Sequence, residues 1–326
     1  MKPDAIEAAQ KRLKPHMNRT PVLRSRLLDR FLGSEILFKY EGAQKVGAFK
    51  ARGALNTLLA LKERGALPQR VIAYSSGNHA QAVAWAARQL GVKAAVYIPA
   101  GSSRVKIAAT KAYGAEVIVA KTRQEAEEAA KTAAQGEGCF LLPPYDHDDV
   151  IAGQGTAALE AWEDEGKFDA VFAPCGGGGL ISGTFLATRL FSADAEVYAA
   201  EPSIANDAAQ SFASGKIFRF NETPKTIADG VRTLGVSART FHFIQQLDGF
   251  YEVSEEDILY WSQWLMHLLK ITVEPTSALG MAAAHQWLGE GNKGKRALVI
   301  LSGANIDSDT YSKIWAQDHL ATLPAL

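Results

Sequence analysis

The chain has 326 residues, of which 47% are hydrophobic, so it can bury an ordinary core and is long enough for two domains. Lysine plus arginine and aspartate plus glutamate both number 35, and this balance excludes the strongly basic surface that binds nucleic acids or anionic membranes. We therefore expect a small neutral or zwitterionic ligand as the partner, with no nucleic acid and no membrane.

The first ten residues contain Asp4 and Glu7, where a signal peptide would need an apolar run, and no later stretch approaches 18 consecutive apolar residues. The two cysteines, Cys139 and Cys175, are too few for a disulfide framework, and we expect both to be buried as small hydrophobic side chains. Together these features predict a cytoplasmic protein.

Short apolar runs alternate along the chain with longer alanine-rich segments of helical period, which is typical of a parallel sheet flanked by helices. The predicted fold class is therefore α/β. The expected strands are residues 36–40, 71–74, 94–98, 117–120, 170–173, 197–200 and 297–301. The expected helices are residues 49–64, 80–90, 103–113, 124–134, 155–163 and 180–190.

The first motif along the chain places Lys50 at the start of a helix, directly after an apolar strand and a turn at Gly47. A lysine in such a position is ordinarily a solvated side chain. A desolvated lysine, in contrast, is a nucleophile that condenses with an aldehyde. The choice between the two depends on whether the same chain also holds an anionic cofactor.

The polar, proline-rich stretch 142–149 is the best candidate for a boundary between domains, because strand and helix segments from about residue 71 precede it. We expect residues 69–147 to form a small domain and residues 1–68 and 148–326 to form a larger, discontinuous one. The acidic and histidine residues of 142–149 resemble a metal site, but a solvated turn explains them more simply.

The second motif is the glycine loop Gly176–Gly179, which follows the strand at 170–173 and opens a helix. Bare backbone amides and a helix N-terminus converge there on one anion, so the loop predicts a phosphate cradle. The dinucleotide fingerprint fails, since its third glycine would fall on Ile181 or Ser182. A phosphate cradle in the same chain favours the nucleophilic role for Lys50.

The chain resembles the serine/threonine dehydratase and serine racemase family of pyridoxal phosphate enzymes, which have the tryptophan synthase β-like fold, known as fold type II. The resemblance runs from about residue 19 to Asn305 and implies a large domain with a smaller inserted parallel-sheet domain. Seven motifs occur in the family's order: the lysine segment 44–54, Ser75-Ser76-Gly77-Asn78-His79, the segment 151–156, the glycine loop, Glu201-Pro202, the segment 226–230, and Ser302-Gly303-Ala304-Asn305.

The resemblance implies that Lys50 holds pyridoxal 5'-phosphate covalently and, once freed by the substrate amine, acts as the general base at the α-carbon. Phe49 would pack beside the cofactor ring, and Asn78 would bond its hydroxyl group. Ser302 would bond the pyridine nitrogen, and since a hydroxyl does not keep that nitrogen protonated, elimination of a β-substituent is favoured. The phosphate would be held by the backbone amides of Gly176, Gly177, Gly178 and Gly179.

The resemblance also implies a substrate site in which Ser76 is a second acid/base on the face of the α-carbon opposite Lys50. Some racemases of the family have an arginine that contacts substrate. The stretch of this chain that corresponds to it aligns only with a gap, and Arg123 is the arginine nearest to that stretch. The residues expected to contact substrate are Ser75, Ser76, Gly77, His79, Asp229 and Thr233.

Oxygen ligands for a hard cation are implied at Glu201, Ala205 and Asp207, which would bind Mg²⁺ or Ca²⁺ in a structural role. A pair of exposed acids on a turn is the alternative explanation of the two carboxylates. Relatives also suggest a homodimer.

We expect a dehydratase, or ammonia-lyase, that converts L-threonine, L-serine or L-threo-3-hydroxyaspartate into a 2-oxo acid and ammonia. The alternative is a racemase of serine or aspartate that uses Lys50 and Ser76 on opposite faces. A nicotinamide-dependent oxidoreductase, or a binding protein without chemistry, is a remote alternative from another class.

Overall fold

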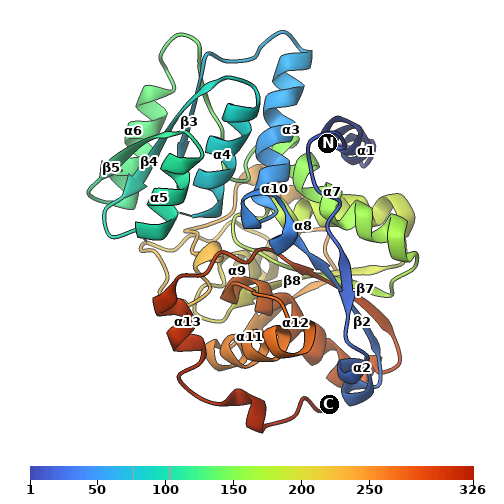
Figure 1. The fold of residues 1–326 in the computed structure, drawn as a ribbon. Helices are drawn as coiled ribbons and strands as arrows, with labels where there is room; N and C mark the ends of the chain where they lie inside the picture. Colours follow the sequence, from blue (N-terminus) through green and yellow to red (C-terminus); the bar gives the residue numbers. More distant parts are fainter. Residues whose placement is uncertain (76, 103) are drawn as a thin grey trace.

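The computed structural model describes residues 1–326 except 76 and 103. Its strands form two separate sheets (Figure 1). The larger sheet has the order β1-β2-β10-β7-β8-β9, with β1 antiparallel to β2 and all other neighbours parallel. Its strands are β1 Val22–Arg24, β2 Glu35–Tyr40, β7 Ala170–Pro174, β8 Glu196–Pro202, β9 Gly249–Val253 and β10 Arg296–Leu301.

The smaller sheet is wholly parallel and has the order β5-β4-β3-β6. Its strands are β3 Arg70–Tyr74, β4 Lys93–Pro99, β5 Glu116–Ala120 and β6 Cys139–Leu141. The α/β class, with a mixed sheet and a separate inserted parallel sheet, is therefore confirmed, while the domain bounds at residues 69 and 147 stay a prediction.

Helices cover both faces of each sheet (Figure 1). On the larger sheet, α7 and α8 pack on one face and α11 and α12 on the other. On the smaller sheet, α3 and α4 cover one face and α6 the other. The helices are α1 Asp4–Leu13, α2 Arg26–Leu32, α3 Lys50–Glu63, α4 Asn78–Gln89, α5 Arg104–Ala112, α6 Arg123–Ala133, α7 Asp148–Glu165, α8 Gly179–Phe191, α9 Asp207–Ser214, α10 Ala238–Ile244, α11 Glu255–Leu269, α12 Pro275–Trp287 and α13 Ser308–Ile314.

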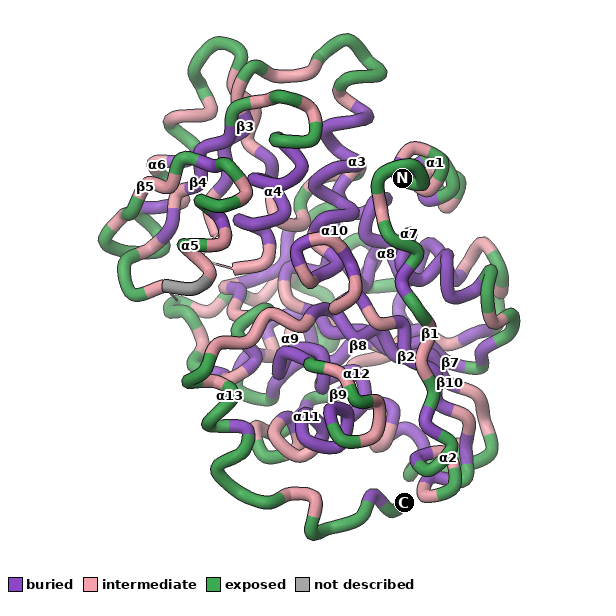
Figure 2. The backbone as a smooth tube through the Cα atoms, viewed as in Figure 1, coloured by how far each residue is buried: buried purple, intermediate pink, exposed green. Residues whose placement is uncertain are grey.

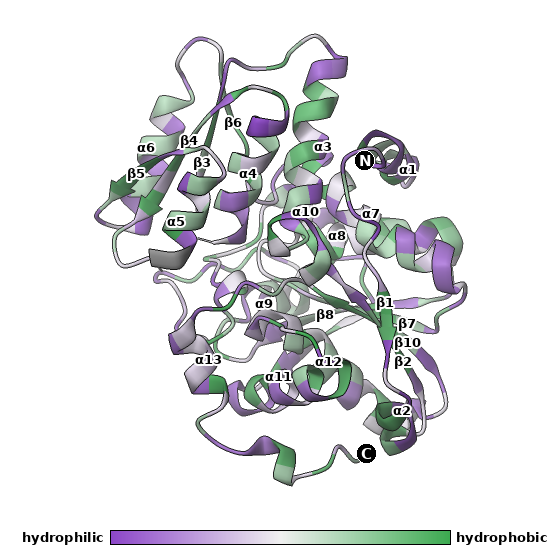
Figure 3. Cartoon of the chain, viewed as in Figure 1, coloured by the Kyte–Doolittle hydropathy of each residue, from purple (hydrophilic) through white to green (hydrophobic). Residues whose placement is uncertain are grey.

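Central strands of the larger sheet are apolar without alternation because both of their faces are covered. All five residues of β7 are buried, and β10 is buried from Ala297 onward (Figure 2). Figure 3 shows the same strands as hydrophobic bands inside a more polar exterior. This continuous apolar pattern is what made the strands visible in the sequence.

All seven predicted strands and all six predicted helices are present, with shifted ends. The largest shift is in α7, which begins at Asp148 although the sequence placed its start at residue 155. Gly153 and Gly155 lie inside this helix because neighbouring backbone is very close: a Cβ on Gly155 would lie 2.6 Å from the Gly183 carbonyl oxygen of α8. The two glycines therefore permit close packing of helices and do not mark a turn.

The stretch 142–149 forms a turn that leads into α7. His147 caps that helix by accepting from the Asp149 amide, and Asp148 pairs with Arg239 of α10. Cys175 is buried as expected, but Cys139 is only partly buried, because it opens the edge strand β6. Among the described helices, none is long and apolar enough to cross a membrane.

Candidate active site

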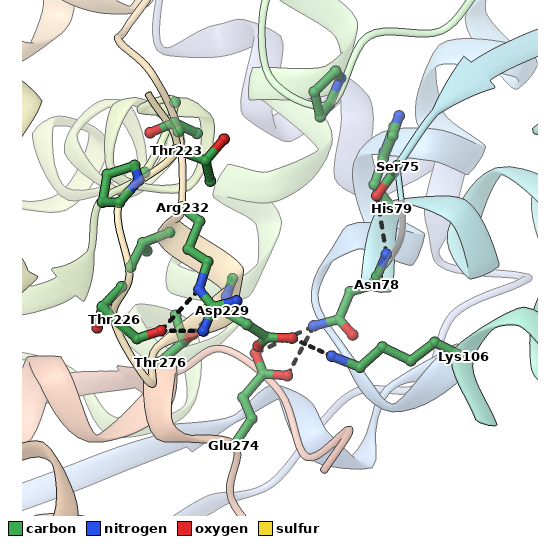
Figure 4. A pocket seen from close by; sticks show the side chains of 18 of the residues that line it. Ser75, Asn78, His79, Lys106, Thr223, Thr226, Asp229, Arg232, Glu274 and Thr276 are labelled. Carbon is green, nitrogen blue, oxygen red and sulfur yellow. Dashed lines mark hydrogen bonds and ion pairs between the residues drawn. The ribbon is translucent and has the colours of Figure 1, made fainter. Parts of the chain in front are cut away.

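A cavity of about 1040 Å³ opens between the two sheets. The ends of β3 and β4 of the smaller sheet and of β7 and β10 of the larger sheet contribute to its lining. Parallel α/β sheets bind ligands at the carboxyl ends of their strands, because loops and helix N-termini converge there. The described residues that were predicted to bind cofactor or substrate line this cavity, and Figure 4 labels several of them.

Lys50 is the first residue of α3 and lines the cavity. Its Nζ donates to the Pro144 carbonyl oxygen at 2.7 Å and lies 5.0 Å from the centre of the Phe49 ring. Burial lowers the pKa of Lys50 to about 8, although the Glu274 carboxylate opposes that shift. The neutral form of the Lys50 amine is therefore far more populated near physiological pH than that of an ordinary lysine, which favours a role as nucleophile or general base.

The turn before Lys50 is fixed by the loop that follows β10. Val46 has a φ of 57°, and the amide of Asn305 donates to its carbonyl oxygen at 2.7 Å. The backbone amide of Phe49 donates to the Ser302 carbonyl oxygen at 3.1 Å. Because of these bonds, the lysine motif and the late serine motif form one structural unit although they lie far apart in the chain.

The glycine loop crosses the cavity at the N-terminus of α8, where the first amides have no acceptor within the helix. Gly178 has a φ of +86°, and a Cβ on it would lie 2.8 Å from Ile244. A Cβ on Gly177 would lie 2.1 Å from the Tyr145 ring. Glycine is therefore required by both conformation and space, and the backbone stays open to an anion.

A cluster of polar side chains also lines the cavity. The amide nitrogen of Asn78 donates to both Glu274 carboxylate oxygens, at 2.9 and 3.2 Å, and the Ser302 hydroxyl donates to one of them at 3.2 Å. Burial and the neighbouring Asp229 raise the pKa of Glu274 to about 7. Sequence reasoning missed Glu274. A glutamate before Pro275 is typical of a helix start, but nothing in the sequence shows that this helix begins at the cavity.

The loop expected to bind the substrate carboxylate opens α4. Ser75 and Gly77 line the cavity, and the Ser75 hydroxyl oxygen accepts from the Gly77 amide at 3.2 Å. Ser76, the predicted second acid/base, lies outside the described residues. His79 donates from Nε2 to the Leu142 carbonyl oxygen at 2.9 Å, and burial and the nearby Lys50 lower its pKa to about 3, so the ring is neutral.

Across the cavity, the segment 226–233 faces the smaller sheet. Asp229 forms an ion pair with Lys106 of α5, and Figure 4 shows this pair beside Glu274. Burial lowers the pKa of Lys106, but the carboxylates of Asp229, Glu274 and Asp307 together outweigh that effect, so the net shift is upward. Arg123 of α6 donates to the Arg232 carbonyl oxygen. A second positively charged side chain, from a helix beside the smaller sheet, therefore contacts the segment 226–233.

The predicted cation ligands lie at the end of β8 and the start of α9, outside the cavity lining. Glu201 and Asp207 are fully buried, and burial raises the pKa of both, that of Asp207 to about 7. Glu201 accepts from two backbone amides, whereas Oδ2 of Asp207 has no hydrogen-bond partner. The alternative of two exposed acids is therefore wrong.

Two buried carboxylates with an unpartnered oxygen fit a hard cation, since such groups are costly without a compensating charge. Within the described residues, no cluster of three or more histidine, cysteine, aspartate or glutamate side chains suits a metal, so the Ala205 carbonyl oxygen or water would have to complete the ligand set. Thr233 lines the cavity and donates to Asp207 at 3.3 Å, which connects this site with the cavity.

The cavity residues also fit pyridoxal 5'-phosphate. The chain supplies an amine of lowered pKa at Lys50, an anion cradle that only glycine permits, and a buried hydroxyl group at Ser302. These are the three groups that an aldehyde-bearing, phosphorylated pyridine needs. The roles of the individual residues stay predictions.

Comparison with known proteins agrees with this geometry. A family model described as pyridoxal-phosphate dependent enzyme matches residues 13–303. A serine racemase of Schizosaccharomyces pombe is 43% identical over 96% of this chain and 97% of its own length. An L-threo-3-hydroxyaspartate ammonia-lyase of Saccharomyces cerevisiae is 44% identical over 95% of both chains.

A solved structure of a threonine deaminase from T.th. superposes with a TM-score of 0.88 at 44% identity, covering 94% of this chain and 99% of the other. These matches extend over the whole fold and include both sheets. The chain therefore belongs to the pyridoxal-phosphate dependent enzymes, within the family of serine/threonine dehydratases and serine racemases.

Proposed function

We propose that the protein catalyses the pyridoxal phosphate-dependent elimination of water from a small β-hydroxy amino acid, which yields a 2-oxo acid and ammonia. The observation that carries this proposal is the Lys50 amine, which lines the cavity beside the glycine loop with a pKa lowered to about 8. A lysine so placed can both hold an aldehyde and abstract a proton. Relatives named ammonia-lyases support the elimination chemistry.

When bound, pyridoxal phosphate supplies an electron-withdrawing ring that acidifies the α-carbon of the substrate. Lys50 Nζ then accepts the α-proton as general base. The loop at Ser75 and Gly77, together with the N-terminus of α4, orients the substrate carboxylate. His79 supports that loop as a neutral ring, because its pKa of about 3 prevents it from competing for the proton.

We further propose a preference for a substrate with a second carboxylate, such as L-threo-3-hydroxyaspartate. Arg123 and Arg232 line the cavity, and among the described residues their guanidinium groups donate to carbonyl oxygens and form no ion pair with an acidic side chain. A guanidinium without an acidic partner is suited to a carboxylate ligand. Two relatives, 44% and 42% identical, are named L-threo-3-hydroxyaspartate ammonia-lyases.

Racemisation is the second candidate function, and relatives named serine racemases support it. The same proton abstraction at the α-carbon begins both reactions, and they differ in whether the β-hydroxyl group leaves. Incubation with L-serine, L-threonine and L-threo-3-hydroxyaspartate, with oxo acid and D-isomer quantified, separates them. We expect oxo acid to dominate, and an excess of D-isomer would contradict the dehydratase proposal.

The covalent site is tested by borohydride reduction of the holoprotein followed by peptide mapping. We expect the pyridoxyl label on Lys50 alone. A label on another side chain, or no label, would contradict the proposal.

We also propose that Glu201, Ala205 and Asp207 hold Mg²⁺ or Ca²⁺, and that the protein is a cytoplasmic homodimer. The buried carboxylates support the cation. The dimer follows from the resemblance, and light scattering of the purified protein tests it.

A further inference from the structure

Four charged side chains are buried together beside the first turn of α3. They are Lys39 of β2, Glu41 directly after β2, Arg52 of α3 and Glu160 of α7. The first three are fully buried, and Glu160 is 7% exposed. These four described residues do not line the active-site cavity, and the proposed reaction has so far given them no task.

Arg52 lies at the centre of this cluster. Its Nε and Nη2 donate to the two carboxylate oxygens of Glu41 at 2.7 and 2.8 Å. Its Nη1 and Nη2 donate to the two oxygens of Glu160, also at 2.7 and 2.8 Å, and Lys39 Nζ lies 2.7 Å from Glu160. One planar guanidinium therefore binds two carboxylates through two hydrogen bonds each, which fixes both direction and distance.

Stabilisation alone does not explain such a cluster. Burying paired charges costs desolvation free energy, and well-packed apolar side chains of similar volume are often at least as stabilising. A network of directional hydrogen bonds, in contrast, defines one orientation of the elements that it joins. Those elements are β2, α3 and α7.

The backbone of the same turn of α3 also contacts α7. Phe49 is the N-cap residue of α3, and in the described structure its side chain makes no capping bond. The Gly53 amide donates instead to Gln154 of α7 at 3.1 Å. A Cβ on Gly153 would lie 2.7 Å from the Arg52 carbonyl oxygen, so the two helices touch there. Both the side chain and the backbone of Arg52 thus contact α7.

This turn carries Lys50, two residues before Arg52. The Lys50 amine donates to the Pro144 carbonyl oxygen at 2.7 Å, and Pro144 lies shortly before the start of α7 at Asp148. Donor and acceptor therefore belong to the two helices that Arg52 joins. A shift of α3 along α7 would separate them and would admit water to the amine.

We propose that Arg52 is a positioning residue that fixes the first turn of α3 against α7 and so holds the Lys50 amine in its desolvated place. Glu41 and Glu160 are the two groups that anchor Arg52. The inference rests on the proposed function, because it concerns the amine that captures the aldehyde. The effect is one of position and not of charge, since two basic and two acidic side chains give the cluster a formal charge of zero.

The pKa of Lys50 reports its position and can be measured in the apoprotein, without turnover. Competitive labelling with acetic anhydride over a pH series, followed by peptide mapping, gives the midpoint for this one amine. We expect a midpoint of about 8 in the wild type. Arg52→Lys keeps the charge but cannot bind two carboxylates in this geometry. As water reaches the amine, the midpoint should rise by at least about one pH unit toward the ordinary value of 10.5.

Glu41→Gln separates position from charge. The loss of a carboxylate can only lower the pKa of a nearby amine, so a rise of the Lys50 midpoint in this variant reports displacement. We expect a rise that is smaller than in Arg52→Lys. Should Arg52→Lys not fold, as judged by circular dichroism, Glu41→Gln decides the same question.

Arg64→Lys is the matched control. Arg64 follows the last residue of α3 and pairs with Asp149 of α7 at 2.6 Å, so the same substitution is made between the same two helices, far from Lys50. Its Lys50 midpoint should equal that of the wild type. In turnover, kcat should fall by about 10²-fold in Arg52→Lys, as for a reacting group displaced by about 1 Å, and should change little in Arg64→Lys.

A Lys50 midpoint that stays near 8 or falls in the folded Arg52→Lys and Glu41→Gln variants would overturn the proposal. An equal rise in Arg64→Lys, or a wild-type midpoint near 10.5, would overturn it as well. A wild type whose Lys50 titrates near 8 but takes up no pyridoxal phosphate would overturn the proposed function instead, and would leave the role of Arg52 unaffected.

Discussion

The Lys50 amine is useful because of what surrounds it. The desolvation that lowers its pKa to about 8 comes from the cavity walls, and the Pro144 carbonyl oxygen holds its Nζ in place. An exposed lysine would keep a pKa near 10.5 and would be almost entirely protonated at neutral pH. The residue type was evident in the sequence, and its reactivity depends on burial.

This difference predicts how the apoprotein captures its cofactor. Only a neutral amine attacks an aldehyde, so the second-order rate of pyridoxal phosphate binding should rise with pH and level off above a midpoint of about 8. Stopped-flow absorbance measures this rate. Lys50→Ala should form no covalent adduct at any pH and should lose turnover while its circular dichroism stays native. A midpoint near the ordinary lysine pKa would show that Lys50 is not desolvated in solution.

At the scale of elements, the loop between β7 and α8 can be tested by adding one methyl group. Gly177→Ala should weaken cofactor binding at least about tenfold, because its Cβ would lie 2.1 Å from the Tyr145 ring and must displace either the ring or the loop. Fluorescence titration of the apoprotein measures the affinity. Gly289→Ala is the control, since nothing lies within 4 Å of its Cβ. Equal affinities for the two variants would mean that the loop does not hold the cofactor.

The junction between β8 and α9 makes a separate prediction about cations. Free Mg²⁺ or Ca²⁺ at a hundred times its Kd should stabilise the wild type by about 2.7 kcal/mol and raise Tm by a few degrees. Glu201→Gln should abolish this response. The control is Glu252→Gln, which changes the exposed cross-strand neighbour of Glu201 on β9 and should keep the response. A wild-type Tm that ignores both cations would exclude the site.

At the scale of the whole molecule, helix α5 beside the smaller sheet contacts the segment 226–233 through the ion pair between Lys106 and Asp229. The Lys106 side chain is only 12% exposed. Asp229→Asn should leave Lys106 without its partner and raise KM by roughly tenfold, which corresponds to about 1.4 kcal/mol. Steady-state kinetics with the best substrate measures this. Lys131→Met removes an exposed pair with Glu127 on α6 and should change KM little. An unchanged KM in Asp229→Asn would show that the pair does not support the substrate site.

The fold was largely predictable because its central strands are buried on both faces and therefore appear as continuous apolar runs. The strands that sequence reasoning missed, β1, β6 and β9, each lie at an edge of a sheet, and β1 and β6 have only three residues. Such strands are specified by their neighbours more than by their own sequence. The same holds for α7, whose inner glycines are explained only by the helices against it.

By itself, the sequence determined the α/β class, the lysine and glycine motifs and their order. The class follows from local periodicity, and the motifs follow from residue types, such as four consecutive glycines, that few other structures require. Only the tertiary structure decided that Glu274 accepts a hydrogen bond from Ser302 and that Lys106 pairs with Asp229. Partners that are 28 and 123 residues apart meet through the arrangement of the two sheets, which no local pattern encodes. The shifted pKa values have the same origin, since burial belongs to the folded chain and not to any residue in it.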